Sequence, residues 1–426
     1  MRRLDDRRDH RYVSAATVSA LSLVTILFFG RFLFPKAEEL AIPFLNWMTF
    51  LREGGLIGIY DRVEDQYGPG TYLMLTLANW IADTFKMAPY PAFKLVQFGF
   101  VVATLLVGAA VSGSLERAQL LVLLVATNSV IFGSLDILNT PFLLYAFWAL
   151  GQGRHGAFAA AFVASCLCKY QPLVFAPIIA ACLLRRLFHA WKASPHQAAR
   201  LVGVLALPTV VLFGLSFVFF GLTWPLSGMR AVQTYTGLLS GYALNLHWLL
   251  GFVEQLLDGR LAAANGMIAL QGTTSLDVTL SRWVLYATML GLVVAYLRRP
   301  DTPASLYGFS AAVFLAYYMI PTTVLANHLQ AVLPPLFLLA THQAGRSWLT
   351  FWGLNFSVSL ILFLIWPHSR VFLGVDISVP LAVLTVGAFG LYLVQLLTRD
   401  DAAPTLADEA DESSAQPLAA SRGRIL

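Results

Sequence analysis

Charged residues are scarce in this sequence: Asp, Glu, Lys and Arg together make up 12% of its 426 residues, while 58% are hydrophobic. Soluble domains average roughly 25% charged residues, so this composition excludes a soluble catalytic domain. The mean hydropathy is +0.69, and apolar segments of about 20 residues recur along the chain. Because a backbone in lipid must satisfy its hydrogen bonds internally, we expect an all-α polytopic membrane protein.

Cysteine is nearly absent too. Cys166, Cys168 and Cys182 all fall in one apolar stretch, without partners elsewhere and without the spacing of a metal site backed by histidine. They exclude a disulfide framework and are expected to be small core residues. The pI of 9.1 comes from arginines in loops, so no nucleic-acid-binding face is expected.

The apolar segments predict about twelve membrane-spanning helices. The first is followed by Phe-Pro-Lys rather than by a small-residue cleavage site, which favours a retained anchor over a signal peptide. The expected spans are 14–34, 91–112, 118–134, 137–151, 156–169, 171–186, 201–222, 282–297, 303–320, 329–342, 347–366 and 377–397.

Arginines and lysines indicate the orientation of these spans. The N-terminal stretch MRRLDDRRDHR is rich in arginine, and the alternate loops LERAQ, GQGRHG, RRLFHAWKASPHQAAR, LRRPD and HQAGRS are short and basic. The positive-inside rule places them in the cytoplasm, so both termini are expected there. Residues 1–397 are expected to form a single transmembrane domain, followed by a disordered acidic cytoplasmic tail over 398–426.

Two long loops, 35–90 and 223–281, are expected on the opposite face. The first contains amphipathic stretches from Glu38 to Leu51 and from Tyr72 to Phe85, separated by turns that contain glycine and proline. These stretches predict helices that lie along the membrane interface. The second loop contains YALNLHWLLGFVEQLL, which predicts a further interfacial helix.

Lys169 is the single charge between Ala157 and Leu184. The break at Lys169-Tyr170-Gln171-Pro172 predicts two short spans that meet at the outer surface. A lysine within one long span would cost at least about 3 kcal/mol, which makes that arrangement less favourable. A lysine that snorkels to the interface is the simpler alternative for its role.

Polar residues on the expected outer face suggest chemistry. Glu38 and Glu39 precede an amphipathic helix, Asp136 lies in a tight turn between two spans, and Lys169 and His328 lie in other connections. Each has an ordinary alternative role: a charge at a helix N-terminus, an N-cap, or a satisfied buried histidine. Together, however, a carboxylate that accepts a hydroxyl proton and a cation that stabilises a departing phosphate are what transfer from a lipid phosphate requires.

Five stretches occur in a characteristic order: EELAIPFLNW through YGPGTYLMLTL, SLDILNTPFLLYAFWAL, CLCKYQPLVFAP, GYALNLHWLLG and NHLQAVLPPLFLL. Together they resemble the multispanning glycosyltransferases of the GT-C fold, especially the bacterial polyprenol-phosphate-mannose-dependent members (the GT87-like mannosyltransferase group). The resemblance extends over residues 36–340. The chain departs from the family pattern in having glutamate for the usual aspartate, YGP for YPP, and no late His-Glu pair.

The resemblance implies an inverting hexosyltransferase of the bacterial inner membrane. It would move mannose or another hexose from a polyprenyl-phosphate-sugar donor to a lipid-linked or glycan acceptor, in contact with membrane lipid and without a metal or other cofactor. Glu39 or Glu38 would be the base, Asp136 would orient the acceptor or the base, Lys169 would bind the donor phosphate, and His328 would assist there. The further substrate-binding residues that it implies are Gln171, Asn327, Tyr67, Asn245, Trp248 and Arg230.

Three other classes of protein stay open. A transporter or flippase of lipid-linked glycans predicts related halves and charged or broken helices near the bilayer midplane. A polysaccharide polymerase or ligase normally relies on arginines and a histidine in one large outer loop, and the 223–281 loop has few arginines in or near it. A membrane scaffold without catalytic activity would not need the carboxylates, Lys169 and His328 to converge.

Overall fold

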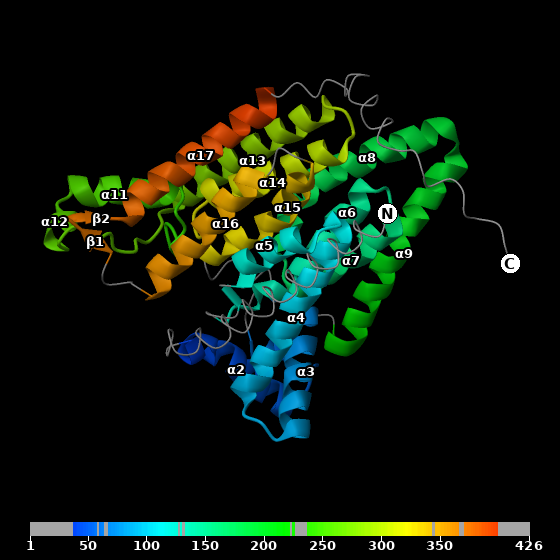
Figure 1. Ribbon diagram of the computed structural model, residues 1–426, viewed down its shortest axis with the longest axis horizontal. Coiled ribbons are helices and arrows are strands. Elements are labelled where there is room, and N and C mark those ends of the chain that lie inside the picture. The colour runs from blue at the N-terminus through cyan, green and yellow to red at the C-terminus, as the bar shows by residue number, and fades with distance from the viewer. Residues whose placement is uncertain are drawn as a thin grey trace, which may run out of the picture.

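The structure is a computed structural model in which most described residues are helical. It describes residues 37–57, 59–63, 67–126, 128–129, 133–221, 224–225, 237–342, 346–365 and 370–398. This helical content confirms the predicted all-α class (Figure 1). The chain is therefore a helical protein embedded in a membrane. Helical segments long and apolar enough to cross it are α4 (Pro89–Ser112), Gln171–Ala193, α9 (Pro195–Phe220), α13 (Ser275–Leu297) and α17 (Ser378–Thr398).

The other elements are shorter. Among the described elements, η1, η3, η4 and η5 are 3-10 turns, η6 is a π-helical turn that precedes the strands, and β1 and β2 form a two-stranded hairpin. Their bounds are α2 Ala37–Gly54, η1 Ile59–Asp61, α3 Pro69–Phe85, α5 Leu115–Ala126, η3 Leu135–Leu138, α6 Thr140–Gly151, α7 His155–Cys168, η4 Gln171–Phe175, α8 Ala176–Ala193, α11 Leu246–Leu257, α12 Arg260–Ala263, α14 Pro303–Met319, η5 Ala326–Val332, α15 Leu333–Thr341, α16 Arg346–Leu360, η6 Ile361–Ile365, β1 Val371–Phe372 and β2 Val375–Asp376.

Each predicted span on described residues coincides with a helix, but several helices are short. α5 and α6 have 12 residues each and α7 has 14, fewer than the roughly 20 residues that cross a bilayer. The number of twelve spans therefore stays a prediction. The first predicted span, 14–34, and the predicted tail beyond Thr398 lie outside the described residues.

The predicted break at Lys169 is confirmed. Helix α7 ends at Cys168, and Lys169 has an extended backbone with φ −153° and ψ 142° before the next helical turn begins at Gln171. Lys169 pairs with Tyr67 as an isolated antiparallel bridge. The amide of Gly68 donates to the Cys168 carbonyl at 3.0 Å. The end of α7 is thereby joined to the start of α3, about 100 residues earlier in the chain.

Gly68 permits this close approach. A Cβ atom on Gly68 would overlap the carbonyl oxygen of Leu167, so only glycine fits where the start of α3 meets the end of α7. The hydroxyl of Thr71, in the first turn of α3, donates to the Cys168 carbonyl at 2.7 Å. This junction fixes the place of Tyr67 relative to Lys169.

Both amphipathic stretches of the first long loop form helices, as predicted, and these lie together at the bottom of Figure 1. The Asn79 amide on α3 donates to the Met48 carbonyl on α2 at 2.7 Å. Arg52 pairs with Asp83 at 2.7 Å on their exposed side. The predicted helix in the second loop is also present as α11.

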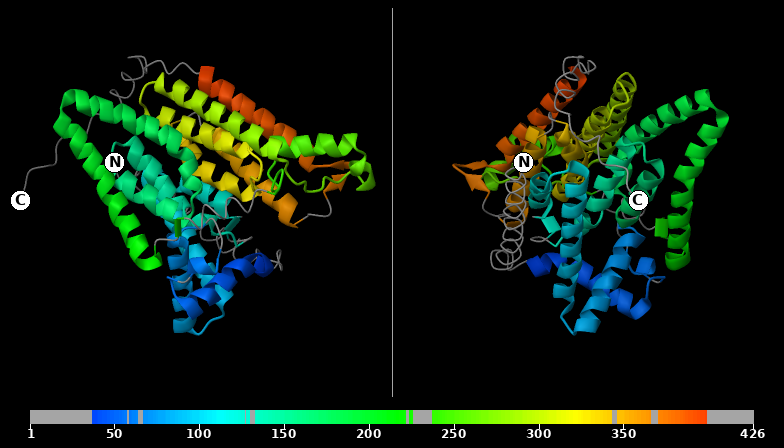
Figure 2. Two further views of the ribbon diagram at one scale, coloured as in Figure 1. Left: turned by 180° about the vertical axis from the view of Figure 1, so that it is seen from behind. Right: turned by 45° about the vertical axis from the view of Figure 1, so that its right-hand side comes forward.

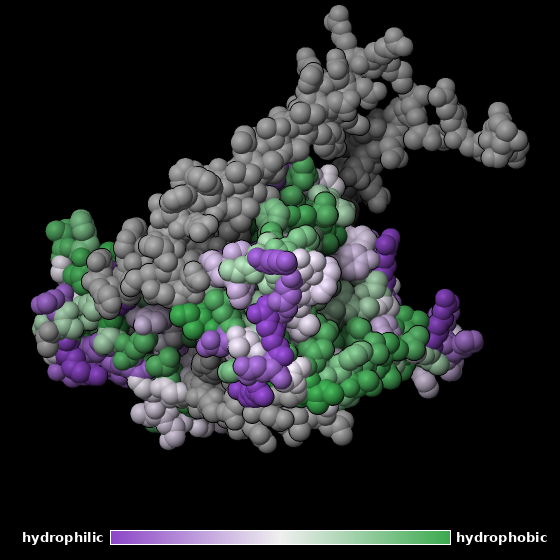
Figure 3. All heavy atoms as spheres, turned by 90° about the horizontal axis from the view of Figure 1, so that it is seen from below, coloured by the Kyte–Doolittle hydropathy of each residue, from purple (hydrophilic) through white to green (hydrophobic). Residues whose placement is uncertain are grey.

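The main core surrounds α14, which is buried along almost its whole length between α13, α15, α8 and α17. By contrast, α9 exposes large apolar side chains such as Leu207, Val210 and Val218, as expected for contact with lipid. Helices α8 and α9 meet at Ser194 and form an arm at one side of the molecule (Figure 2). Seen from below, hydrophobic residues cover much of the coloured surface (Figure 3). The three cysteines are buried and free, as predicted.

Candidate functional site

A buried ion pair lies at the centre of the candidate site. The Lys169 ammonium contacts Oδ1 of Asp136, and each side chain is only 2% exposed. Asp136 lies in the 3-10 turn η3 that precedes α6, and Lys169 follows the last residue of α7. Two charges so deeply buried are stable only when they are paired and hydrogen-bonded. The Lys169 ammonium is therefore paired with Asp136 in the interior. The alternative in which this lysine snorkels to the interface is wrong.

The second carboxylate oxygen of Asp136 is surrounded by donors. Its Oδ2 accepts from Asn327 Nδ2 at 2.8 Å, Ser134 Oγ at 3.0 Å and Asn128 Nδ2 at 3.2 Å. Burial opposes ionisation of Asp136. The Lys169 ammonium and the hydrogen bond from Ser134 outweigh burial and hold the pKa of the carboxyl below its usual value. Asp136 is therefore a fixed anion to which three segments of the chain are bound.

Aromatic side chains cover the ammonium of Lys169. Its Nζ lies 5.0 Å from the centre of the Tyr67 ring, within the range of a cation–π interaction. Tyr67 packs edge-on against Trp47 at 5.7 Å and Phe44 at 5.9 Å, both from α2. Phe44 and Trp47 of α2 thus support the Tyr67 ring that lies beside the ion pair.

The η5 turn contributes the third side of the site. Gln171 donates through Nε2 to the His328 carbonyl at 2.9 Å, and the Tyr317 hydroxyl lies 3.3 Å from His328 Nδ1. Burial, together with the charge of Lys169, lowers the pKa of His328 to about 3, so its imidazole is neutral at ordinary pH. Its Nε2 is buried and has no hydrogen-bond partner among the described residues.

Six residues singled out in the sequence meet in this centre. They come from distant segments; the hydrogen-bonded pair Asp136 and Asn327, for example, is 191 residues apart. We call this group the polar centre: Tyr67, Asp136, Lys169, Gln171, Asn327 and His328.

Sequence reasoning missed several residues that support the polar centre. Gln330 accepts from Asn128 Nδ2 at 2.6 Å and donates to the Thr140 hydroxyl at 3.0 Å. It therefore connects η5 to the connection before Asp136 and to the start of α6. Its place two residues after His328, within a stretch already singled out, is the signal that could have identified it.

Helix α4 supports the same connection from the other side. Lys94 donates to the Ser129 carbonyl at 2.9 Å, and Gln97 donates to the Ser134 carbonyl at 2.8 Å. Positions three apart lie on one face of a helix, so Lys94 and Gln97 together hold the backbone at Ser129, next to Asn128, and at Ser134. Two polar residues at this spacing in an otherwise apolar helix were the available signal.

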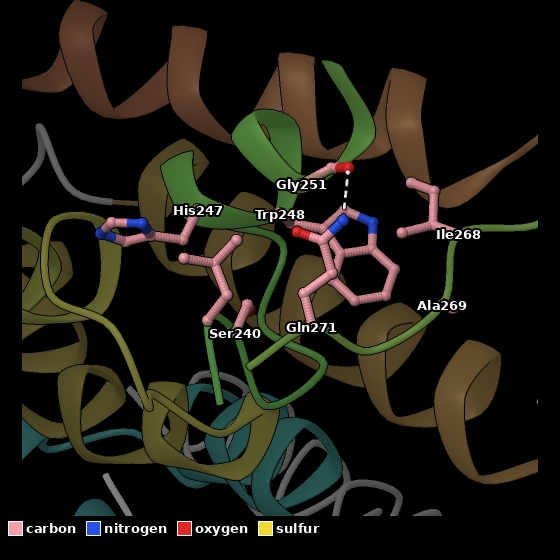
Figure 4. Close-up of a pocket in the computed structure, with 8 residues that line it drawn as sticks. Ser240, His247, Trp248, Gly251, Ile268, Ala269 and Gln271 are labelled. Carbon is pink, nitrogen blue, oxygen red and sulfur yellow. Dashed lines mark hydrogen bonds between the residues drawn. The ribbon is translucent and has the colours of Figure 1, made fainter. Parts of the chain in front are cut away.

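Asn245 and Trp248 have other partners. The Asn245 side chain caps α11 by accepting from the Trp248 amide at 3.1 Å, and it donates to the Tyr318 carbonyl at 3.2 Å. The Trp248 indole donates to Ser378 Oγ at 2.8 Å and is 2% exposed. Trp248 and His247 line a small pocket with Ser240 and Gln271 (Figure 4). These contacts give Asn245 and Trp248 roles in holding α11, and their predicted role in substrate binding stays a prediction.

The remaining predicted residues are described only in part. Glu38 and Glu39 lie in the first turn of α2, but their side chains, like the whole of Arg230, lie outside what the structure describes. The start of α2 is close to the polar centre, because the Cβ of Ala41 lies 3.4 Å from where a Cβ on Gly133 would be. Among the described residues, no three His, Cys, Asp or Glu side chains are grouped as metal ligands would be.

No protein-family model matches this chain, and no curated protein matches it. The fold and the site define a helical membrane protein in which an ion pair, two amides, a neutral histidine and a tyrosine ring meet at the ends of helices.

Proposed function

We propose that this protein is an inverting glycosyltransferase of the GT-C type in the bacterial inner membrane. It moves a hexose, such as mannose, from a polyprenyl-phosphate donor to a lipid-linked or glycan acceptor at the extracytoplasmic face. The observation that carries this proposal is the polar centre, in which Lys169, Asp136 and His328 meet beside the Tyr67 ring.

The arrangement of helix ends supports phosphate binding at this place. Four helical segments begin there: α3 after Gly68, η3 at Leu135, η4 at Gln171 and η5 at Ala326. Helix N-termini direct unpaired amide groups and a positive dipole outward, which favours an anion. The cation of Lys169 lies among them. In the proposed role Lys169 binds the donor phosphate while Asp136 holds the ammonium in place.

The proposed reaction needs a base, and α2 supplies the candidates. Glu39 or Glu38 takes the proton from the acceptor hydroxyl, whose oxygen attacks the anomeric carbon of the donor sugar. The bond from that carbon to the phosphate oxygen breaks, and the polyprenyl phosphate leaves with the electron pair, so the configuration inverts. Asp136 orients the acceptor or the base, and His328, neutral at ordinary pH, can donate a hydrogen bond to the phosphate.

The place of the polar centre bears on the transporter alternative. Asp136 precedes α6, Lys169 follows α7, and His328 precedes α15, so the charges lie at helix ends. A transporter site near the midplane is also formed where broken helices end. The position of these charges therefore fits both classes, and the transfer and transport measurements separate them.

The decisive experiment is transfer of a radiolabelled hexose from polyprenyl phosphate in membranes that contain the full chain. We expect Glu39→Gln and Lys169→Ala to lower the rate by about 100-fold or more, as expected for loss of a base or of an electrostatic donor. The matched controls are Glu53→Gln, an exposed glutamate on α2 that pairs with Arg62, and Lys86→Ala at the exposed end of α3.

The outcome separates the alternatives. Full activity of Glu39→Gln, Glu38→Gln and Lys169→Ala would show that the assigned residues do not carry the reaction. If the parent protein transfers no sugar but moves a lipid-linked glycan across vesicle membranes, the protein is a flippase. Thermal unfolding of each variant in detergent distinguishes loss of activity from loss of folding.

A further inference from the structure

The short hairpin between α16 and α17 has an unusual turn. Strands β1 and β2 pair with Phe372 opposite Val375, so Leu373 and Gly374 alone form the turn. Both have positive φ, 51° and 80°. Such two-residue turns favour asparagine or aspartate before glycine, because a bulky side chain is strained in the left-handed region. A leucine at this position calls for an explanation.

The hairpin is held rigidly at its base. Arg370 and Asp376 form an ion pair at 3.3 Å, with side chains 3% and 0% exposed. Both also bind the backbone of Ile268 in the second long loop, Arg370 by donating to its carbonyl at 2.9 Å and Asp376 by accepting from its amide at 3.1 Å. Gly266 packs so closely on the turn that a Cβ there would overlap the carbonyl of Gly374. These contacts fix the base of the hairpin and the backbone of its turn, so the Leu373 side chain stays exposed.

The tip of this rigid hairpin is apolar and exposed. Leu373 is 88% exposed and Phe372 is 68% exposed, and Val375 beside them is about half exposed. Two bulky apolar side chains held away from the protein by a strained turn are unfavourable in water. The same side chains are favoured in the boundary between lipid head groups and acyl chains.

Helix α11, whose Trp248 lies against Arg370 at the base of the hairpin, also exposes apolar side chains. It packs against α17, and its exposed side carries a stripe of leucine and valine at helical spacing: Leu246, Leu250, Val253 and Leu257. Helix α17 is long and apolar enough to cross the membrane. It also exposes apolar side chains, including Val383, Leu384 and Leu391. The hairpin, α11 and the start of α17 lie at the same end of the molecule in Figure 1.

We propose that the hairpin tip, Phe372 and Leu373, and the exposed stripe of α11 are inserted together into the lipid leaflet beside α17. The occupant of this surface is the bilayer itself, because α11 packs against α17, a helix long and apolar enough to cross the membrane, and both expose apolar side chains. The buried Arg370–Asp376 pair sets the angle at which the tip enters the leaflet. This inference does not depend on the proposed enzymatic activity.

The test places an environment-sensitive fluorophore on an introduced cysteine in the full chain, reconstituted in phosphatidylcholine and phosphatidylglycerol vesicles. The three native cysteines are buried, so Leu373→Cys can be labelled selectively. Parent protein treated with the same fluorophore measures the background labelling of the native cysteines. The control is Glu53→Cys, near the end of α2 and outside the proposed surface, where the native side chain is 59% exposed and pairs with Arg62.

We expect the Leu373→Cys probe to emit at shorter wavelength in vesicles, to be quenched by nitroxide-labelled lipids and to be protected from iodide. The Glu53→Cys probe should be quenched by iodide. If iodide quenches the Leu373→Cys probe as strongly as the control, the tip lies in water and the proposal is wrong. Protection from both quenchers would mean that another protein surface covers the tip, which equally overturns the proposal.

Discussion

At the scale of single residues, the ion pair of the polar centre predicts that a single variant is less stable than the double variant that removes both charges. Lys169→Met leaves Asp136 as a buried charge without its cation, and this should lower the free energy of unfolding by about 3–5 kcal/mol. Asp136→Asn combined with Lys169→Met removes both charges and should recover part of that loss. Chemical unfolding in mild detergent measures both values. Equal stability of the single and double variants would contradict the pairing.

The neutral state of His328 gives a pH dependence with a defined sign. Its pKa is about 3 in the folded protein, compared with about 6.5 in an unfolded chain. Between these values the unfolded state binds more protons, so stability is fully present above pH 6.5 and decreases as the pH falls through this window. His328→Gln removes this titration and should make stability less dependent on pH between about 6.5 and 4.5.

Unfolding midpoints at a series of pH values measure the effect of this histidine. His189→Gln is the control, because His189 lies near the end of α8 and away from the polar centre. An unchanged pH profile for His328→Gln would show that this histidine is not held neutral in the folded protein.

At the scale of elements, the junction of α3 and α7 depends on one glycine. Gly68→Ala places a Cβ against the Leu167 carbonyl and forces the start of α3 away from the end of α7. Because overpacking in a close contact costs about 1–3 kcal/mol, we expect a loss of stability in this range and weaker contact of Tyr67 with Lys169. Gly99→Ala in α4, where nothing lies within 4 Å, should be neutral or stabilising. Thermal unfolding midpoints of both variants measure the difference. Equal midpoints would contradict a close contact between the start of α3 and the end of α7.

The helices could be predicted from the sequence because long apolar runs and proline breaks are local signals. The end of α7 at Cys168 and the start of η4 at Gln171 match the break expected at Lys169-Tyr170-Gln171-Pro172. The hairpin of residues 371–376 gave no such signal, since its strands have only two residues each and are held by Arg370 and Asp376 rather than by strand pattern. Lengths of helices alone did not establish how many of them cross the membrane.

At the scale of the whole molecule, the polar centre joins distant parts of the chain. The sequence identified Asp136, Lys169 and His328 by residue type, but it could not identify their partners, because hydrogen-bond partners are set by three-dimensional packing. Asn128 and Gln330, for example, are 202 residues apart and bond at 2.6 Å. Prolines and glycines mark where helices stop, whereas nothing local marks which helix ends will meet.

This convergence predicts energetic coupling between the two halves of the chain. Asn327 and Asn128 both donate to Oδ2 of Asp136, so the effects of Asn327→Ala and Asn128→Ala on stability should not add, with a coupling of about 0.5–3 kcal/mol. Asn327→Ala combined with Arg52→Ala should be additive, since Arg52 pairs with Asp83 on the exposed side of α2 and α3. Unfolding of the three single and two double variants measures both sums. Additivity in both pairs would mean that the polar centre does not act as one network, and that Asn128, before η3, and Asn327, in η5, stabilise the fold independently.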